Sequence, residues 1–297
     1  MTRELSISII GLDTSHAIEL PRLLQAPDRA EGLAVSGARV KRCLRFETPF
    51  QNKEGLDQRQ KQLEQWGVQV TESFDEAIKD CDALMLEIND PAYHVDYFTR
   101  CAGLGKPLFL DKPLADTFPH AEQLLAEARK RGTRFFSASS LRFIPQLEEA
   151  CQRVPEPSYA CVYGPLGKAP AGSSIVWYGV HAFEMLQRAM GNGAQKVLTR
   201  RDDRGAVVVV RYKDGRRGIV ELNDGAWIYG GVLRTQTTAK PFTADLTRMY
   251  PDLLTRIVTF FQGGSAPVAL EATREIMAML DAAERSLKSG VEEATGV

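Results

Sequence analysis

Short apolar runs alternate with segments of helical hydrophobic spacing along the first 138 residues. The apolar runs predict strands at residues 5–10, 39–46, 68–70, 83–88, 107–110 and 133–138. Helices are predicted through residues 20–25, from a Ser73–Glu76 capping box to about residue 80, and over residues 119–130. Strands that alternate with helices at this spacing predict an α/β fold with a doubly wound, mostly parallel sheet.

The second half of the chain has a different pattern, in which strand-like segments follow one another across short turns. Strands are predicted at residues 158–163, 196–201, 206–212, 218–223 and 227–237, and helices at 180–190, 246–261 and 271–287. Asp214-Gly215 is a hairpin signal, and Gly191 is a favoured helix stop. The pattern predicts an α+β domain built on a largely antiparallel open sheet. We therefore expect two domains, residues 1–138 and 139–297, that meet in a run of small residues.

The composition is that of an ordinary globular protein, with 44% hydrophobic and 25% charged residues. The formal net charge of -1 favours neither nucleic acid nor an anionic membrane as a partner, and we find no secretory segment or membrane-spanning run. The five cysteines form no C-x-x-C pair, so we expect no disulfide framework and a cytoplasmic location. The four histidines lack metal-ligand spacing, and no metal is predicted, although distant residues could converge.

The predicted parallel sheet locates a crevice. Ligands of such sheets bind outside the carboxyl ends of the strands, where the strand order reverses, which places the residues after Ile10, Ile88 and Leu110 around one crevice. The last of these strands leads into Lys112, and the following Pro113 restricts the turn. A lysine there can hold a substrate hydroxyl or carbonyl and favour an electron-rich group beside a reacting carbon. The alternative is an exposed loop lysine.

The loop after the first strand departs from a dinucleotide fingerprint. It reads GLDTSH, in which only Gly11 fits the pattern G-x-G-x-x-G, while Asp13 and His16 replace the other glycines. An ionised Asp13 pointed at a pyrophosphate would repel it. The loop therefore predicts a helix cap from Asp13 or Thr14, with Thr14 and Ser15 groups left to bind phosphate, or a plain capping role.

The position that reads the adenosine ribose is also unusual. A carboxylate about 20 residues past the loop would bind the ribose hydroxyls, but the predicted strand end carries Arg42, Arg45 and Glu47. The arginines either accept the 2′-phosphate of NADP or are solvated. Residues 48–57 form either a mobile lid or, as we favour, a long connection.

Several ordered segments carry a family pattern. Residues 105–115, GKPLFLDKPLA, match a G-K-x-V-x-x-E-K-P-L-A segment with Asp111 in place of glutamate, and His94 falls at a loop position that usually has histidine. Residues 140–145, SLRFIP, resemble N-x-R-F-x-P with Ser140 in place of asparagine, and residues 178–186, YGVHAFEML, are similar to the D-x-G-x-H-x-x-D-L signature, whose first position falls at Trp177. Together with a closing helix over residues 267–288, they resemble the glucose–fructose oxidoreductase/inositol dehydrogenase/MocA-like (Gfo/Idh/MocA) family along nearly the whole chain.

The resemblance implies a Rossmann domain, NAD or NADP as cofactor, and hydride exchange with a sugar, polyol or similar small hydroxylated substrate. Lys112 and His181 match the family's catalytic lysine and histidine, and His181 would be the general acid/base. Without the resemblance, a lone histidine that opens a helix is more often structural. The candidate cofactor contacts are Gly11, Asp13, Thr14, Ser15, His16, Arg45, Asn89, His94, Asp111 and Lys112. The candidate substrate contacts are Arg142, Trp177, Tyr178 and Glu184.

Two departures mark a divergent branch of the family. Trp177 stands where the family has an aspartate four residues before the histidine, and an indole cannot orient an imidazole ionically, although it can stack on a sugar ring or on nicotinamide. Glu184 lies three residues after His181 on the same helix face, where it orients His181, binds a hydroxyl or makes a surface contact.

Three functions fit these residues. The first is a nicotinamide-dependent dehydrogenase in which Lys112 polarises the reacting oxygen and His181 exchanges its proton. The second uses NAD transiently in elimination or hydrolysis of a glycosidic bond, and the third is a non-catalytic relative that binds a metabolite or a protein. The open sheet of the second domain has a face that needs cover, so a homo-oligomer, dimer or tetramer, is expected.

Overall fold

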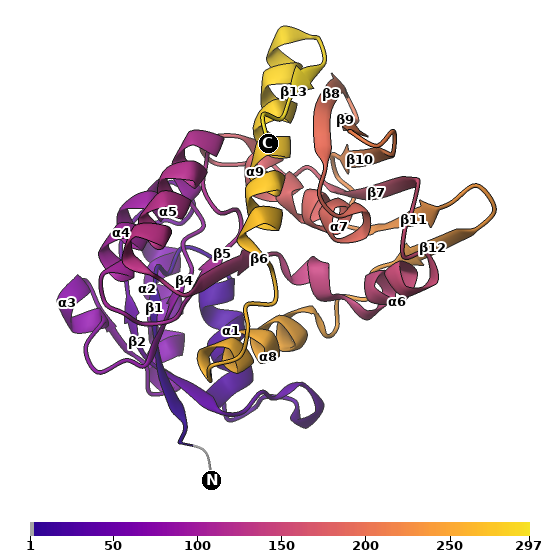
Figure 1. Cartoon of the computed structure of the whole chain (residues 1–297). Coiled ribbons are helices and arrows are strands. Elements are labelled where there is room, and N and C mark those ends of the chain that lie inside the picture. Colours follow the sequence, from indigo (N-terminus) through magenta and orange to yellow (C-terminus); the bar gives the residue numbers. More distant parts are fainter. Residues whose placement is uncertain (1–2) are drawn as a thin grey trace. The chain divides into compact units, whose positions relative to one another are not determined.

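The computed structural model describes residues 3–297 and divides into two compact units, shown along the chain in Figure 1. Within the described residues, unit 1 comprises residues 3–115, Glu122–Ser137 and Tyr250–Val268, and unit 2 comprises Asp116–Ala121, Ala138–Met249 and Ala269–Val297. The change of unit after Ser137 lies next to the predicted domain boundary. The two units are not continuous in sequence, because residues 250–268 group with the first unit and residues 116–121 with the second.

Unit 1 is built on a six-stranded parallel sheet with the strand order β3-β2-β1-β4-β5-β6. Its strands are β1 (Leu5–Ile10), β2 (Ala38–Leu44), β3 (Gln69–Thr71), β4 (Ala83–Leu86), β5 (Leu108–Asp111) and β6 (Phe135–Ala138). β1, β4, β5 and β6 are almost wholly buried, as apolar strands covered on both faces must be. The order reverses between β1 and β4, so the predicted crevice lies at their carboxyl ends.

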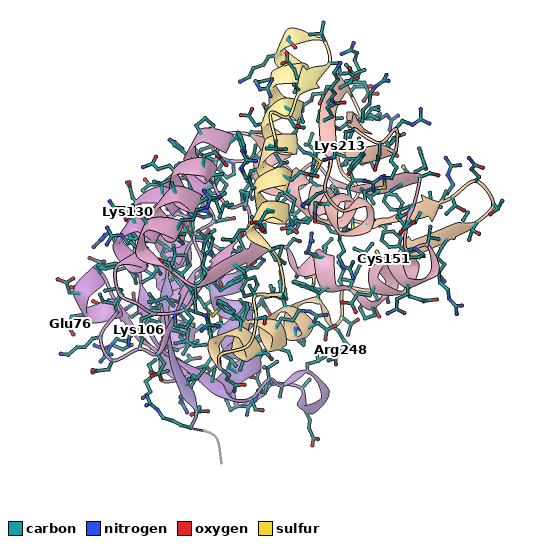
Figure 2. All side chains as sticks on the ribbon, viewed as in Figure 1. Glu76, Lys106, Lys130, Cys151, Lys213 and Arg248 are labelled. Carbon is teal, nitrogen blue, oxygen red and sulfur yellow. The ribbon has the colours of Figure 1, made fainter. Side chains whose placement is uncertain are left out.

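Helices cover this sheet (Figure 1). They are α1 (His16–Gln25), α2 (Lys53–Gln65), α3 (Phe74–Ala77), α4 (His94–Ala102), α5 (Phe118–Arg131) and α8 (Met249–Phe261). Phe136 on β6 meets Phe260 on α8 edge to face, with ring centroids 5.1 Å apart, which fixes α8 against the sheet. Figure 2 shows the charged side chains of Glu76 and Lys130 on the outside, where both residues are exposed.

Unit 2 is built on a seven-stranded mixed sheet in the order β12-β11-β7-β10-β9-β8-β13, in which only the β7–β10 pair is parallel. Its strands are β7 (Tyr159–Pro165), β8 (Ala194–Asp202), β9 (Gly205–Tyr212), β10 (Arg217–Asn223), β11 (Gly230–Arg234), β12 (Ala239–Thr243) and β13 (Glu293–Ala294). Alternating burial along β9 and β10 gives the sheet one packed and one open face. Helices α6 (Pro145–Arg153), α7 (Val180–Met190) and α9 (Leu270–Ser289) complete the unit.

The predicted fold class is confirmed, with corrections in detail. The α7 helix has the predicted bounds, the β9–β10 hairpin turns at Gly215 with φ +87°, and Ser73 caps α3 by accepting a hydrogen bond from the Glu76 N–H. Helices α2, α4 and α6 and strands β12 and β13 were not predicted. The strand expected from residue 227 begins only at Gly230. The connection expected over residues 48–57 contains the start of α2, whose polar sequence has few apolar residues to reveal a helical period.

Candidate functional site

The loop after β1 meets the end of β4 closely. Gly11 has φ +107°, and a Cβ atom there would lie 2.4 Å from the carbonyl oxygen of Glu87. A side chain at this position is therefore excluded by both backbone conformation and contact with β4. Gly11, which the sequence placed in a cofactor-binding loop, therefore also allows the ends of β1 and β4 to approach each other closely.

The Asp13 carboxylate accepts hydrogen bonds from three groups of its own chain. Its Oδ1 accepts a hydrogen bond from the N–H of Asn89 at 2.8 Å, and its Oδ2 accepts from the Thr48 hydroxyl at 2.7 Å and the N–H of Asp90 at 3.3 Å. Burial raises the pKa of Asp13, and these three hydrogen bonds oppose the shift. The carboxylate ties the loops after β1, β2 and β4 together. It does not cap α1, as one alternative predicted, and Thr48 is a member of this network that the sequence did not indicate.

The start of α1 remains available to an anion. Ser15 occupies the N-cap position but makes no side-chain capping bond, while Thr14 Oγ1 accepts from the N–H of His16 at 3.3 Å. The amides of a helical first turn attract phosphate groups through their N–H donors and the helix dipole. Thr14 therefore contributes a weak local cap, and Ser15 is exposed beside it.

The arginine expected near a ribose is already paired. Arg45 Nη2 lies 2.5 Å from Asp57 Oδ1, and its Nη1 donates to Gln60 Oε1 at 2.6 Å, both on α2. From the same helix, Arg59 Nη1 donates to the carbonyl oxygen of Leu12 at 2.9 Å. The unpredicted α2 helix therefore sets the surroundings of both Arg45 and the β1 loop.

His94 is held between two stretches of loop backbone, and its role as a cofactor contact stays a prediction. The residue is fully buried, with Nε2 2.8 Å from the carbonyl oxygen of Ile88 and Nδ1 3.2 Å from that of Leu114. This side chain clamps the backbone after β4 to the backbone after β5. Asn89, by contrast, takes part in the site through its backbone N–H bond to Asp13.

A buried charged cluster joins the ends of β4 and β5 to the start of α1. His16 Nδ1 lies 2.7 Å from Asp111 Oδ2 and 4.0 Å from Glu87 Oε2, and Lys112 Nζ lies 4.0 Å from Asp111 Oδ2. Although burial raises the pKa of Asp111, His16 and Lys112 lower it to about 2. Burial and the Asp111 charge raise the pKa of Glu87 well above its usual range. Lys112 is therefore a buried cluster member, 5% exposed, rather than an exposed loop lysine.

In unit 2, His181 opens α7 against a serine. Its Nδ1 lies 2.6 Å from Ser139 Oγ, which also accepts a hydrogen bond from the N–H of Leu141 at 3.1 Å. The Ser139 N–H in turn donates to Glu184 Oε1 at 3.1 Å. Glu184 is thus linked to His181 through Ser139, a residue that sequence reasoning missed, and at 2% exposure Glu184 makes no surface contact.

Arg142 and Glu184 form a buried pair beneath His181. Arg142 Nη1 lies 3.2 Å from Glu184 Oε2, and its Nη2 donates to Gln187 Oε1 at 2.6 Å. Burial raises the pKa of Glu184, which Arg142 opposes. Their charged groups bond to one another and so support the start of α7, and their role as substrate contacts stays a prediction.

Aromatic rings surround His181 within unit 2. Tyr178 and Tyr229 meet its imidazole edge to face, with centroid separations of 5.1 and 5.9 Å. Tyr178 also contacts Trp177 at 5.2 Å and Trp227 at 5.4 Å, and Trp227 is 62% exposed. Trp177 and Tyr178 belong to the π-helical turn η4 (Ile175–Gly179) that leads directly into α7. The turn therefore places Trp177 ahead of the first residue of α7.

Solved structures of other proteins share the fold of this chain, although no curated protein sequence matches it. Among solved structures, GenD2 from gentamicin A biosynthesis in complex with NAD is similar, with a TM-score of 0.81 and 15% identity over 100% of this chain and 98% of that one. Scyllo-inositol dehydrogenase from Lactobacillus casei, with bound NAD(H) and scyllo-inositol, gives a TM-score of 0.78 and 13% identity over 99% and 100%.

Residues 5–139 match the model of an oxidoreductase family with an NAD-binding Rossmann fold, GFO_IDH_MocA. The matched range spans all six strands of the parallel sheet and includes the Asp13 network and the Lys112 cluster. The structural similarities independently show that the fold continues through the second half of the chain. The Rossmann part of the chain therefore matches the Gfo/Idh/MocA oxidoreductase family.

Proposed function

We propose that this protein is an NAD-dependent dehydrogenase that oxidises or reduces a small hydroxylated compound such as a sugar, polyol or derivative. The observation that carries the proposal is the family match over the sheet whose switch point bears the Asp13 loop and Lys112. The residues present fit the cofactor. The Asp13 carboxylate bonds to two backbone amides and a hydroxyl of its own chain, and Ser15, the N-cap residue of α1, makes no side-chain capping bond.

When bound, the nicotinamide supplies or accepts a hydride. Lys112 polarises the reacting oxygen of the substrate, and His181 exchanges the proton that accompanies hydride movement. Ser139 holds the His181 ring through Nδ1, and the Arg142–Glu184 pair holds Ser139 in turn. Trp177 and Tyr178 provide ring faces suited to the apolar side of a sugar or polyol.

The pairing of Arg45 with Asp57 favours NAD over NADP. An arginine whose charge is already balanced by a carboxylate attracts a 2′-phosphate less than a free one does. From the sequence we further propose that the protein is cytoplasmic. We also propose that it forms a homo-oligomer of two or four copies, which covers the open face of the unit 2 sheet. Within residues 3–297, no helix is long and apolar enough to cross a membrane.

The test combines binding and turnover. NADH and NADPH are titrated while protein fluorescence and melting temperature are followed, and NAD reduction is then measured with a panel of sugars and polyols. We expect Lys112→Met and His181→Asn to lower kcat/KM by about 100-fold or more while NADH still binds, since acid–base groups contribute 10²–10⁴-fold. His120→Gln, at an exposed surface histidine, is the control. Absence of NADH and NADPH binding at millimolar concentration would overturn the proposal. Turnover without net NADH would instead indicate glycosidic-bond chemistry.

A further inference from the structure

Three side chains from separate parts of unit 1 converge at one point. His16 begins α1, Glu87 follows β4, and Asp111 ends β5. One ligand atom from each, the histidine Nδ1 and a carboxylate oxygen from each acid, lies within 4.8 Å of the other two. All three residues are buried, with 8% exposure for His16, 0% for Glu87 and 1% for Asp111. No spacing of these three residues along the chain indicates this convergence.

The carboxylate oxygens of this cluster lack partners. Neither oxygen of Glu87, nor Oδ1 of Asp111, has a hydrogen-bond partner among residues 3–297. Of the four carboxylate oxygens of Glu87 and Asp111, only Asp111 Oδ2 has a hydrogen-bond partner among the described residues, the Nδ1 of His16. Buried carboxylates without donors carry a large desolvation cost unless a positive charge or a donor compensates it. The Glu87 side chain is thus an acceptor that nothing in the described chain satisfies.

The nearby lysine compensates only part of this charge. Lys112 Nζ is 4.0 Å from Asp111 Oδ2, which is the outer limit of an ion pair and beyond hydrogen-bond distance. A bound cation would supply positive charge at a point where the Lys112 ammonium donates no hydrogen bond to the Asp111 carboxylate.

We propose that His16 Nδ1 and the carboxylates of Glu87 and Asp111 bind a divalent transition-metal ion. One imidazole and two carboxylates are a donor set that suits Mn²⁺, Zn²⁺ and similar first-row ions better than Ca²⁺, which takes oxygen ligands alone. The ion satisfies the unpartnered oxygens of Glu87 and Asp111 and pins the start of α1 to the ends of β4 and β5. The site lies beside Lys112 of the proposed active site, but binding of the ion requires neither nicotinamide nor substrate.

The experiment uses the full-length protein, stripped with a chelator and dialysed. Co²⁺ is titrated while ligand-field absorption is recorded, Zn²⁺ is then added in competition, and the melting temperature is measured with and without Zn²⁺. The variants are His16→Gln and Glu87→Gln, and the isosteric glutamine at position 87 preserves the fold if His16→Gln disturbs it. His120→Gln is the control, because His120 and Asp116 form an exposed histidine–carboxylate pair 2.6 Å apart.

We expect one equivalent of Co²⁺ to bind to the wild type and to His120→Gln, with displacement by Zn²⁺ and a rise in melting temperature. Both cluster variants should bind at least about tenfold more weakly, since loss of even an outer partner costs a metal site 10- to 100-fold. The proposal is overturned if the folded wild type binds no Co²⁺ or Zn²⁺. It is equally overturned if binding survives in both cluster variants or is lost in His120→Gln. NADH binding, measured separately on the stripped protein, bears only on the proposed function.

Discussion

Replacement of Asp13 tests whether this carboxylate supports the fold or opposes the cofactor. The structure directs it to two backbone N–H groups, those of Asn89 and Asp90, and to the Thr48 hydroxyl. Asp13→Ala removes the acceptor and leaves buried donors without partners, whereas Asp13→Asn keeps the shape and loses the charge. If Asp13 instead faced the pyrophosphate, both changes would relieve repulsion at little structural cost.

The size of the effect follows from the contacts. A buried donor left unsatisfied costs about 1–3 kcal/mol, and Asp13 is 1% exposed, so solvent does not replace it. The Asn89 amide at 2.8 Å loses a full bond and the Asp90 amide at 3.3 Å a weaker one. Removing the carboxylate also recovers its own desolvation cost. We therefore expect Asp13→Ala to lower the free energy of unfolding of unit 1 by about 2–4 kcal/mol, and Asp13→Asn by about half as much.

The assay needs a signal from unit 1 alone. Of the three tryptophans, only Trp66 lies in unit 1, so a background of Trp177→Phe and Trp227→Phe makes urea-induced fluorescence changes report on that unit. Thr48→Val, measured alone and with Asp13→Ala, gives the coupling between hydroxyl and carboxylate by a double-mutant cycle. Asp75→Asn, at an exposed position on α3, is the matched control.

We expect NADH affinity to fall in the Asp13 variants, because the loops they release form the crevice. Two results would refute this reasoning: a loss of less than about 1 kcal/mol in Asp13→Ala, the low end for one orphaned amide, or tighter NADH binding in Asp13→Asn. The second result would mean that the carboxylate acts on the pyrophosphate after all.

Three further predictions concern other parts of the molecule. Calorimetry should show tighter binding of NADH than of NADPH, and Asp57→Asn, which frees Arg45, should improve NADPH binding; an unchanged NADPH affinity contradicts the pairing argument. Burial raises the pKa of Cys101 to about 12 and that of Cys43 further, so neither thiol should react with a disulfide reagent until the protein unfolds, and rapid labelling of either in the native protein would count against their burial. Val207→Lys, at a 43% exposed position on the open sheet face, should lower the mass measured by light scattering, whereas a monomeric wild type would remove the basis for an oligomer there.

The order of strands and helices was largely readable from local pattern. Buried parallel strands such as β4 and β5 are continuous apolar runs, and α7 has an amphipathic period with a glycine stop, so their physics is contained in a few consecutive residues. The α2 helix was missed because most of its residues are polar, so its sequence shows no clear helical period. Such a helix is stabilised mainly by tertiary packing, which the local sequence does not reveal. The assignment of residues 250–268 to the first unit depends on packing across more than a hundred residues of chain.

For the site, the sequence by itself determined the crevice, Lys112 and His181, because strand ends and ordered motifs are local features. Only the tertiary structure decided what those residues touch. In the folded protein, Asp13 accepts a hydrogen bond from a backbone amide after β4, and Ser139 rather than Glu184 contacts His181. Glu87 lies near His16, a residue distant in sequence. Side-chain partners distant in sequence are set by how strands and helices pack, and hydrogen bonds and burial, which decide charge and chemistry, exist only after that packing.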